Sequence, residues 1–188
     1  MTLTLDEQDR RTLLHAAREA VRAAASGAEI KINPPPALSD ALMAPCGVFV
    51  TLTKHGNLRG CVGFVEPEKP LYATVILAAQ AAAVSDTRFA PVSPDELDDL
   101  SIEISVLTPP VPVSGPKEIE LGKHGIILSK HGRRALFLPS VATSRGWDIE
   151  TTLSHLALKA GLSPDDWREG ARFEVFEAIV VKEDDECS

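Results

Sequence analysis

The residues best suited to chemistry in this chain are a thiol and a guanidinium in the segment Leu58–Gly63, LRGCVG. Arg59 and Cys61 are two positions apart and follow the β-rich run Gly47–Thr53, so in an extended strand both side chains leave the same face of a sheet. Arg59 could favour the thiolate of Cys61, which is the nucleophilic form. The opposing interpretation is a small buried residue, because free cysteine is among the most buried residue types.

Two glycines, Gly60 and Gly63, flank the thiol. Because glycine has no Cβ, a ligand or another backbone segment can come close to the strand at these positions. Arg59 is suited to clamp a carboxylate or phosphate, or else it forms an ordinary ion pair with one of the many acids. These residues predict either a substrate-binding surface beside Cys61 or, if the glycines serve only packing, a tight crossing of strands.

Three further residues are candidates for the same site. Arg88 lies in a loop beside Asp86, where it either contacts a substrate or forms a local pair that shapes the turn. Glu103 is on the non-core face of the strand 101–108 and could act as general base if that strand pairs beside the LRGC strand, or it is simply solvated. His124 precedes a strand and is either an acid or base, or a turn residue.

Metal and cofactor motifs are missing from the sequence. The five histidines show no HxxxH or HxH spacing, and the three cysteines, Cys46, Cys61 and Cys187, form no CxxC pair. Neither a Walker loop, nor a GxGxxG after a strand, nor a GxSxG is present. We therefore predict no bound metal and no cofactor.

Composition excludes two classes of partner. The net charge of −8 and the lack of a basic stripe argue against nucleic acid. The longest apolar run, Leu71–Ser85, is shorter than the ~18–20 residues that cross a bilayer, and the start MTLTLDEQDRR has no signal-peptide pattern. The sequence predicts a cytoplasmic protein that binds neither nucleic acid nor membrane.

The hydrophobic periodicity predicts an α+β fold with largely antiparallel strands, in a large and a small lobe. The helix at 71–85 is apolar on every side and rich in alanine, so it is expected to be buried in the centre. A Pro-rich connector, Ile30–Pro36, follows the first helix and completes an N-terminal segment 1–40. The expected elements are helices at 6–26, 93–100 and 149–160, strands at 47–53, 58–65, 101–108 and 173–181, and a second hairpin at 125–139.

Both predicted hairpins turn at a Lys-His-Gly sequence, TKHGN and SKHGR. In the first, Gly56 and Asn57 are expected to supply the turn. The repeat fits either an ancestral duplication or independent use of common turn residues, and the second is favoured because glycine-containing tight turns are frequent.

Six motifs occur in a fixed order: GVFVTL, LRGCVG, DTRFAPV, IEISVLTPP, KHGIIL and GWD…HLALKAGL…W. Together they resemble the AMMECR-domain family, protein A of the so-called AmmeMemoRadiSam system. The resemblance covers about 41–182, before an acidic tail at 183–188, and implies one AMMECR-type domain over 1–188. It also implies two unequal lobes around antiparallel strands, and a Memo-like protein and a radical S-adenosylmethionine (SAM) protein as partners.

Two functions follow from the sequence. The first is an enzyme or enzyme subunit that uses Cys61 on a small or peptide-bound anionic substrate, in a cleft lined by Arg59, Cys61, Glu103 and Arg88. The second is a non-catalytic module that binds a ligand or partner protein through the same cleft, with Arg59 as anchor.

Overall fold

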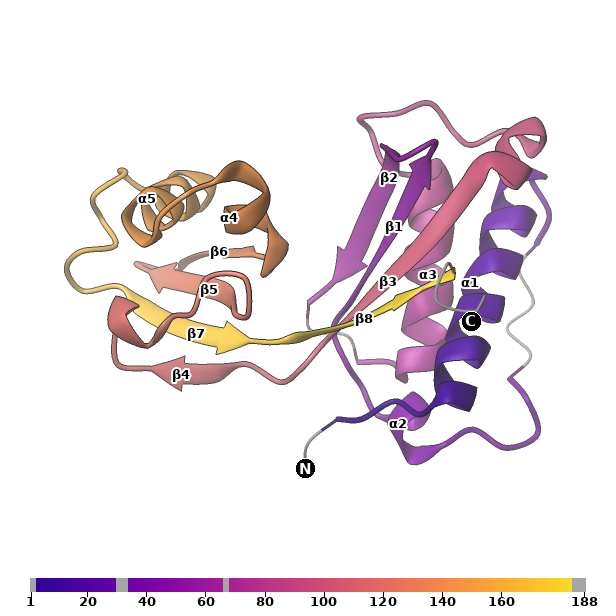
Figure 1. The fold of residues 1–188 in the computed structure, drawn as a ribbon, viewed down its shortest axis with the longest axis horizontal. Coiled ribbons are helices and arrows are strands. Elements are labelled where there is room, and N and C mark those ends of the chain that lie inside the picture. The colour runs from indigo at the N-terminus through magenta and orange to yellow at the C-terminus, as the bar shows by residue number, and fades with distance from the viewer. Residues whose placement is uncertain (1–2, 30–33, 66–67, 184–188) are drawn as a thin grey trace. The chain divides into compact units, whose positions relative to one another are not determined.

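The computed structural model describes residues 3–29, 34–65 and 68–183. The chain divides into two compact units: unit 1 is residues 1–107 with 179–188, and unit 2 is residues 108–178 (Figure 1). The predicted α+β class, the antiparallel pairing and the unequal lobes are confirmed. The predicted connector at Ile30–Pro36 and the acidic tail fall largely outside the described residues, as does Cys187.

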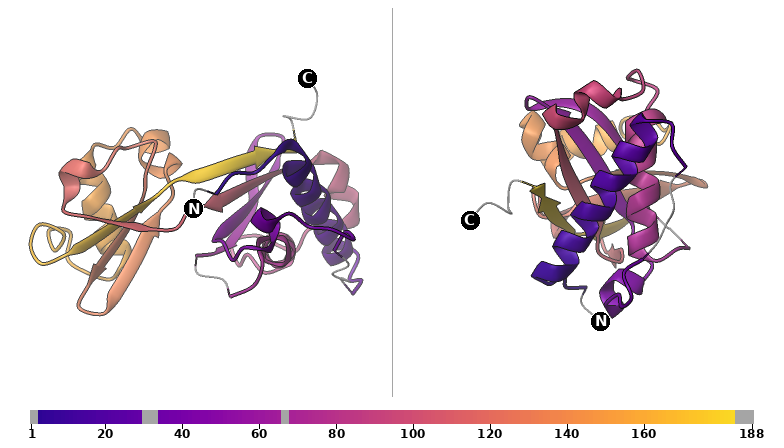
Figure 2. Two further views of the ribbon diagram at one scale, coloured as in Figure 1. Left: turned by 90° about the horizontal axis from the view of Figure 1, so that it is seen from below. Right: turned by 90° about the vertical axis from the view of Figure 1, so that its right-hand side faces the viewer.

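The described residues of unit 1 include the α-helices α1 (Glu7–Ala25), α2 (Asp40–Met43) and α3 (Leu71–Val84). Helix α1 starts at an Asp6 cap, whose side chain and that of Asp9 satisfy each other's backbone N–H groups. Helix α3 is buried on several sides, as its all-apolar sequence predicts. Its alanines let α1 and α3 pack side by side on the sheet (Figure 2).

The sheet of unit 1 contains β1 (Val48–Lys54), β2 (Asn57–Phe64), β3 (Leu100–Leu107) and β8 (Ala178–Lys182), in the order β2-β1-β3-β8 (Figure 1). Apolar side chains at alternate positions face the helices, among them Val50 of β1 and Ile104 of β3, which lie opposite each other. The intervening residues point to the other face, called here the open face. It carries Phe49, Thr51, Cys61, Glu103 and Ser105.

Unit 2 contains a second antiparallel sheet, in the order β4-β7-β5-β6. Leu153, Leu156 and Ala157 of one helix pack on Ile126, Leu128, Phe173 and Val175 of the sheet to form a separate small core. The elements are β4 (Val111–Val113), η2 (Pro116–Glu118), β5 (Gly125–Lys130), β6 (Arg133–Phe137), α4 (Ser140–Arg145), α5 (Ile149–Lys159) and β7 (Arg172–Phe176).

The local predictions need correction at several points. The single strand expected at 173–181 is two strands, β7 and β8, in different sheets. The break is at Glu177, whose backbone N–H donates to Thr108 Oγ1 and whose carbonyl accepts from the Thr108 N–H. Two elements were not expected from the sequence: the short strand β4, which follows the strand at 101–108, and helix α4, which follows the second hairpin. The segment expected as a helix at 93–100 is a 3₁₀-helix, η1 (Pro94–Asp99), whose Glu96 side chain accepts a hydrogen bond from the Ser93 N–H at 3.2 Å.

The two hairpin turns place His and Gly in the left-handed region. His55 and His131 have φ of 49° and 50°, and the glycine after each has φ of 78° and 74°. The central pair of the first turn is therefore His55 and Gly56, and the predicted Gly56–Asn57 pair is wrong by one residue. Two consecutive left-handed residues are the pattern of a type I′ turn.

We expect His131→Asn to raise the free energy of unfolding by about 0.5–1 kcal/mol, because asparagine tolerates the left-handed region better than histidine does. Urea denaturation of the two proteins measures the difference. His55→Asn is the matched comparison and should gain less, since His55 also lies 3.7 Å from the Asp99 carboxylate. A loss of stability in His131→Asn would show that the imidazole makes a contact that outweighs the strain.

Candidate functional site

Cys61 lies on the open face of the unit 1 sheet, in a row of residues that crosses three strands. It is opposite Thr51 of β1, which is in turn opposite Glu103 of β3. The Thr51 hydroxyl donates to Cys61 Sγ at 3.3 Å, and the cysteine is partly exposed. Cys46, by contrast, is buried, and burial raises the pKa of its thiol. Cys61 is therefore an oriented and accessible thiol.

Glu103 shares the open face with Cys61 but does not neighbour it. Strand β1 lies between β2 and β3, so the two residues are separated by two strand spacings, about 10 Å. The Glu103 carboxylate forms an ion pair with Lys182, whose Nζ lies 3.0 Å from Glu103 Oε2. The adjacent strand pairing that would bring Glu103 to the thiol does not occur, and its role as general base stays a prediction.

Asp86 and Arg88 hold Cys61 from the outer edge of β2. The Cys61 N–H donates to Asp86 Oδ2 at 2.9 Å, and Arg88 donates to the Cys61 carbonyl at 3.4 Å. Arg88 also donates to both Asp86 oxygens, at 2.9 and 2.7 Å. Because β2 is an edge strand, these side chains occupy the backbone groups that a further strand would use.

The local pair of Asp86 and Arg88 also leaves an exposed guanidinium beside the backbone of Cys61. The Asp86 side chain is only 6% exposed, and the hydrogen bonds from Arg88 and from the Cys61 N–H hold the pKa of this carboxyl well below its usual range. The Arg88 side chain remains 56% exposed. The guanidinium is thus fixed by Asp86 and still open to solvent.

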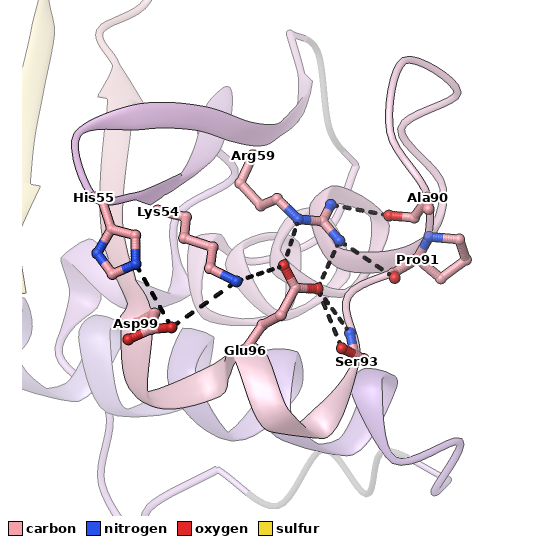
Figure 3. Close-up of polar contacts among 8 residues, drawn as sticks. All are labelled: Lys54, His55, Arg59, Ala90, Pro91, Ser93, Glu96 and Asp99. Atoms are coloured by element: carbon pink, nitrogen blue, oxygen red, sulfur yellow. Dashed lines mark hydrogen bonds and ion pairs between the residues drawn. The ribbon is translucent and has the colours of Figure 1, made fainter.

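Arg59, the predicted anchor, is tied into the protein instead. Leu52 lies opposite Gly60 and Thr53 opposite Leu58, so Arg59 is the extra residue of a β-bulge, and simple alternation with Cys61 does not apply. Its guanidinium donates to both Glu96 oxygens at 3.1 and 2.8 Å (Figure 3).

Further bonds from Arg59 reach the Ala90 carbonyl at 2.9 Å and the Pro91 carbonyl at 3.3 Å. The side chain is 15% exposed, and that of its partner Glu96 is 16% exposed. The structure therefore agrees with the interpretation of Arg59 as part of an ion pair. The same guanidinium also fixes the loop at 90–91 through its hydrogen bonds to the two carbonyls. A direct contact of Arg59 with substrate stays a prediction.

Glu96 is the centre of this network, which Figure 3 shows in full. Besides Arg59, it accepts from Lys54 Nζ at 3.2 Å and from the Ser93 N–H and hydroxyl at 3.2 and 3.3 Å. These donors hold the pKa of the Glu96 carboxyl far below its usual range, and the hydrogen bond from Arg59 has the largest effect. The capping box predicts the Ser93 contact, but no local pattern identifies Arg59 as the second partner.

The two glycines of LRGCVG lie against protein atoms. A Cβ on Gly60 would stand 2.2 Å from the Ala82 carbonyl oxygen of α3, and one on Gly63 would stand 2.5 Å from the Phe49 ring. Gly60 thus lets the strand approach the buried helix, and Gly63 lies under an aromatic ring of the open face. Ligand contact by either glycine stays a prediction.

His124 belongs to unit 2, at the start of β5. Its Nδ1 accepts a hydrogen bond from the Glu120 backbone N–H at 3.1 Å, and the backbone N–H of His124 donates to the Glu120 carbonyl at 2.9 Å. The imidazole therefore closes the turn that leads into the strand, which fits its interpretation as a turn residue. Its proposed acid–base role stays a prediction.

Thr51 is a residue that the sequence interpretation missed. It lies on the predicted strand 47–53, on the same face as Phe49, and alternation alone marks that face as polar or half-buried. Its position opposite Cys61 depends on the register of the β1–β2 hairpin, which the turn sets.

In the described part of the chain, no group of three or more His, Cys, Asp or Glu side chains is placed to hold a metal ion. Nor is any helix among these residues long and apolar enough to span a membrane. The arrangement brings together a thiol and a hydroxyl on the open face, with a guanidinium at the edge of β2.

Comparison with known proteins identifies the family. The AMMECR1 family model matches residues 14–181, so the chain belongs to the AMMECR1 family. A protein of Methanothermobacter thermautotrophicus is 43% identical over 96% of this chain and 97% of its own length. Protein MK0488 of Methanopyrus kandleri is 45% identical over 97% of this chain and 91% of its own length. The crystal structure of PH0010 from Pyrococcus horikoshii has a TM-score of 0.84 at 38% identity, covering 94% of this chain and 92% of that one.

Proposed function

We propose that the chain is an enzyme, or the subunit of one, that uses the Cys61 thiol on a small or peptide-bound anionic substrate. The observation that carries the proposal is an exposed guanidinium, that of Arg88, held against a partly exposed cysteine. In this proposal Cys61 supplies the reactive sulfur, and Arg88 binds the substrate's carboxylate or phosphate.

Two features support Arg88 as the anion-binding group. Asp86 fixes its guanidinium through two hydrogen bonds, so little side-chain freedom is lost when an anion binds. The donors of Arg59, in contrast, already serve Glu96 and two loop carbonyls. We therefore assign substrate binding to Arg88 and a positioning role to Arg59, which anchors the loop from which Arg88 projects.

As partners we propose a Memo-like protein and a radical SAM protein, because the AMMECR family is associated with the AmmeMemoRadiSam system.

A second candidate function is a non-catalytic module that binds a ligand or protein on the same open face. One observation favours it: the group that contacts the Cys61 sulfur is the Thr51 hydroxyl, and Glu103 is paired with Lys182. A hydroxyl does not take up the thiol proton as a general base does.

Alkylation by iodoacetamide at neutral pH, followed by mass spectrometry, separates the two. We expect Cys61 to react at least about tenfold faster than Cys46, which is buried. Arg88→Gln should slow the reaction at Cys61 roughly three- to tenfold, because a neighbouring cation stabilises the negative charge that the attacking sulfur carries. Arg88→Lys keeps the charge and should retain most of the rate.

A Cys61 that reacts as slowly as Cys46 would contradict the enzyme proposal. A Cys61→Ser variant that folds and keeps partner-dependent activity would leave only the binding function. A fast rate that Arg88→Gln does not change would remove Arg88 from the site.

A further inference from the structure

Unit 2 carries a cluster of aromatic and cationic side chains that the proposed function does not use. The Trp147 ring stacks on His155 with centroids 4.1 Å apart and planes 5° apart, and Phe137 lies 6.1 Å from Trp147. The Arg145 guanidinium lies 5.0 Å from the Trp147 ring centre, and the Lys159 ammonium lies 5.1 Å from that of Phe137.

Helix α5 adds an apolar residue to this cluster. Leu158 is 51% exposed and is three positions after His155, so the two lie on one side of the helix. We call Phe137, Arg145, Trp147, His155, Leu158 and Lys159 the aromatic–cationic patch. Trp and Arg are the residue types that most often dominate the binding energy of protein interfaces.

The charges of unit 2 make this patch positive. Residues 108–178, all of which the structure describes, contain nine Lys or Arg and nine Asp or Glu, so the unit is neutral and the net charge of −8 belongs to the rest of the chain. Six of those nine acids form ion pairs, and within the unit no carboxylate lies within ion-pair distance of Arg145 or Lys159. The cations of the ion pairs are Lys123, Lys130, Arg134 and Arg168.

Lys159 is also held in a site that favours a carboxylate partner. Its ammonium donates to the Leu136 carbonyl at 2.9 Å and packs against the Phe137 ring, and this burial lowers the pKa of Lys159. An acid placed beside the ammonium would offset that cost. Trp147 is fixed by its stacking on His155, so its ring is already ordered for a partner.

We propose that the aromatic–cationic patch docks a partner protein through a short segment that combines acidic and apolar side chains. Its carboxylates pair with Arg145 and Lys159, and its apolar groups cover Leu158 and the Trp147 and His155 rings. A nucleic acid would also suit stacked rings and cations. The protein is favoured because the patch includes the exposed Leu158, which an apolar side chain covers and a phosphate backbone does not.

The test is a titration of the intact protein with a short acetylated peptide of alternating Glu and Leu, followed by the indole N–H resonances in NMR. We expect the Trp147 signal to shift saturably and the shift to weaken as salt rises. The Trp167 signal should not move, because Trp167 is buried and its indole N–H donates to Ser154 at 3.1 Å. A matched Lys–Leu peptide should leave both signals unchanged.

Charge-reversal variants check the assignment. Arg145→Glu and Lys159→Glu should each raise the dissociation constant roughly tenfold or more. Lys117→Glu, the same charge change at an exposed site elsewhere in unit 2, should change it less than about twofold. Circular dichroism establishes that each variant is folded, and Arg145→Gln replaces any variant that is not.

Three results would overturn the proposal. The first is no Trp147 shift with the acidic peptide at about 1 mM. The second is an unchanged affinity in Arg145→Glu and Lys159→Glu. The third is tighter binding of oligothymidylate than of the peptide, which would assign the patch to nucleic acid.

Discussion

Gly60→Ala is expected to lower the free energy of unfolding by about 3 kcal/mol or more. The new Cβ would stand 2.2 Å from the Ala82 carbonyl oxygen and 3.1 Å from its carbonyl carbon, and both belong to the backbone of α3. Neither the edge strand β2 nor the buried helix can give way without opening the core. Urea denaturation measures the loss.

Gly115→Ala is the matched control for this substitution. Nothing lies within 4 Å of a Cβ at Gly115, whose φ is 170° and is therefore accessible to alanine. The free energy of unfolding of Gly115→Ala should stay within about 0.5 kcal/mol of that of the parent protein. A Gly60→Ala protein that is as stable as Gly115→Ala would show that β2 does not lie as close to α3 as described. If LRGCVG were only a packed crossing, Gly60→Ala would cost stability and leave ligand binding unchanged.

Glu96→Gln is expected to destabilise the protein by about 2–3 kcal/mol at neutral pH. The guanidinium of Arg59 would lose its charged partner while remaining mostly covered, and Lys54 and the Ser93 N–H would lose an acceptor. Glu7→Gln is the control: its ion pair with Arg11 is more than half exposed on both sides, so little should change.

The effect of Glu96→Gln should depend on pH in one direction. The pKa of Glu96 is lower in the folded protein than the ordinary value of 4.5. Its contribution to stability is therefore complete above pH 4.5 and is lost as the pH falls from there toward the folded-state pKa. The stability difference between parent and variant should be constant from pH 6 to 8 and shrink below about 4.5. A difference that grows on acidification would contradict the ion-pair network.

Much of the fold could be predicted because its signals are local. The Asp6 capping box, the all-apolar helix α3 and the two Lys-His-Gly hairpins are each set by neighbouring residues. The passage from β7 to β8 could not, because the alternating pattern runs through Glu177 without interruption. Only the pairing with Thr108, distant in sequence, breaks the strand.

The candidate site divides in the same way. Cys61 and the Asp86–Arg88 pair are close to motifs visible in the sequence, so their candidacy could be predicted. The partner of Arg59 could not, because Glu96 comes from a separate 3₁₀-helix and the β-bulge redirects the side chain. The separation of Glu103 from Cys61 depends on strand order, which periodicity does not encode.

The most direct measurement compares the alkylation of Cys61 by iodoacetate, which is anionic, with that by iodoacetamide, which is neutral. Each rate is expressed relative to a free-cysteine peptide, so that intrinsic reactivity cancels. If Arg88 and Cys61 form an anion-binding thiol site, iodoacetate should be favoured at Cys61 by roughly three- to tenfold, and Arg88→Gln should abolish the preference. Equal relative rates in the parent protein, or a preference that Arg88→Gln leaves intact, would contradict the account.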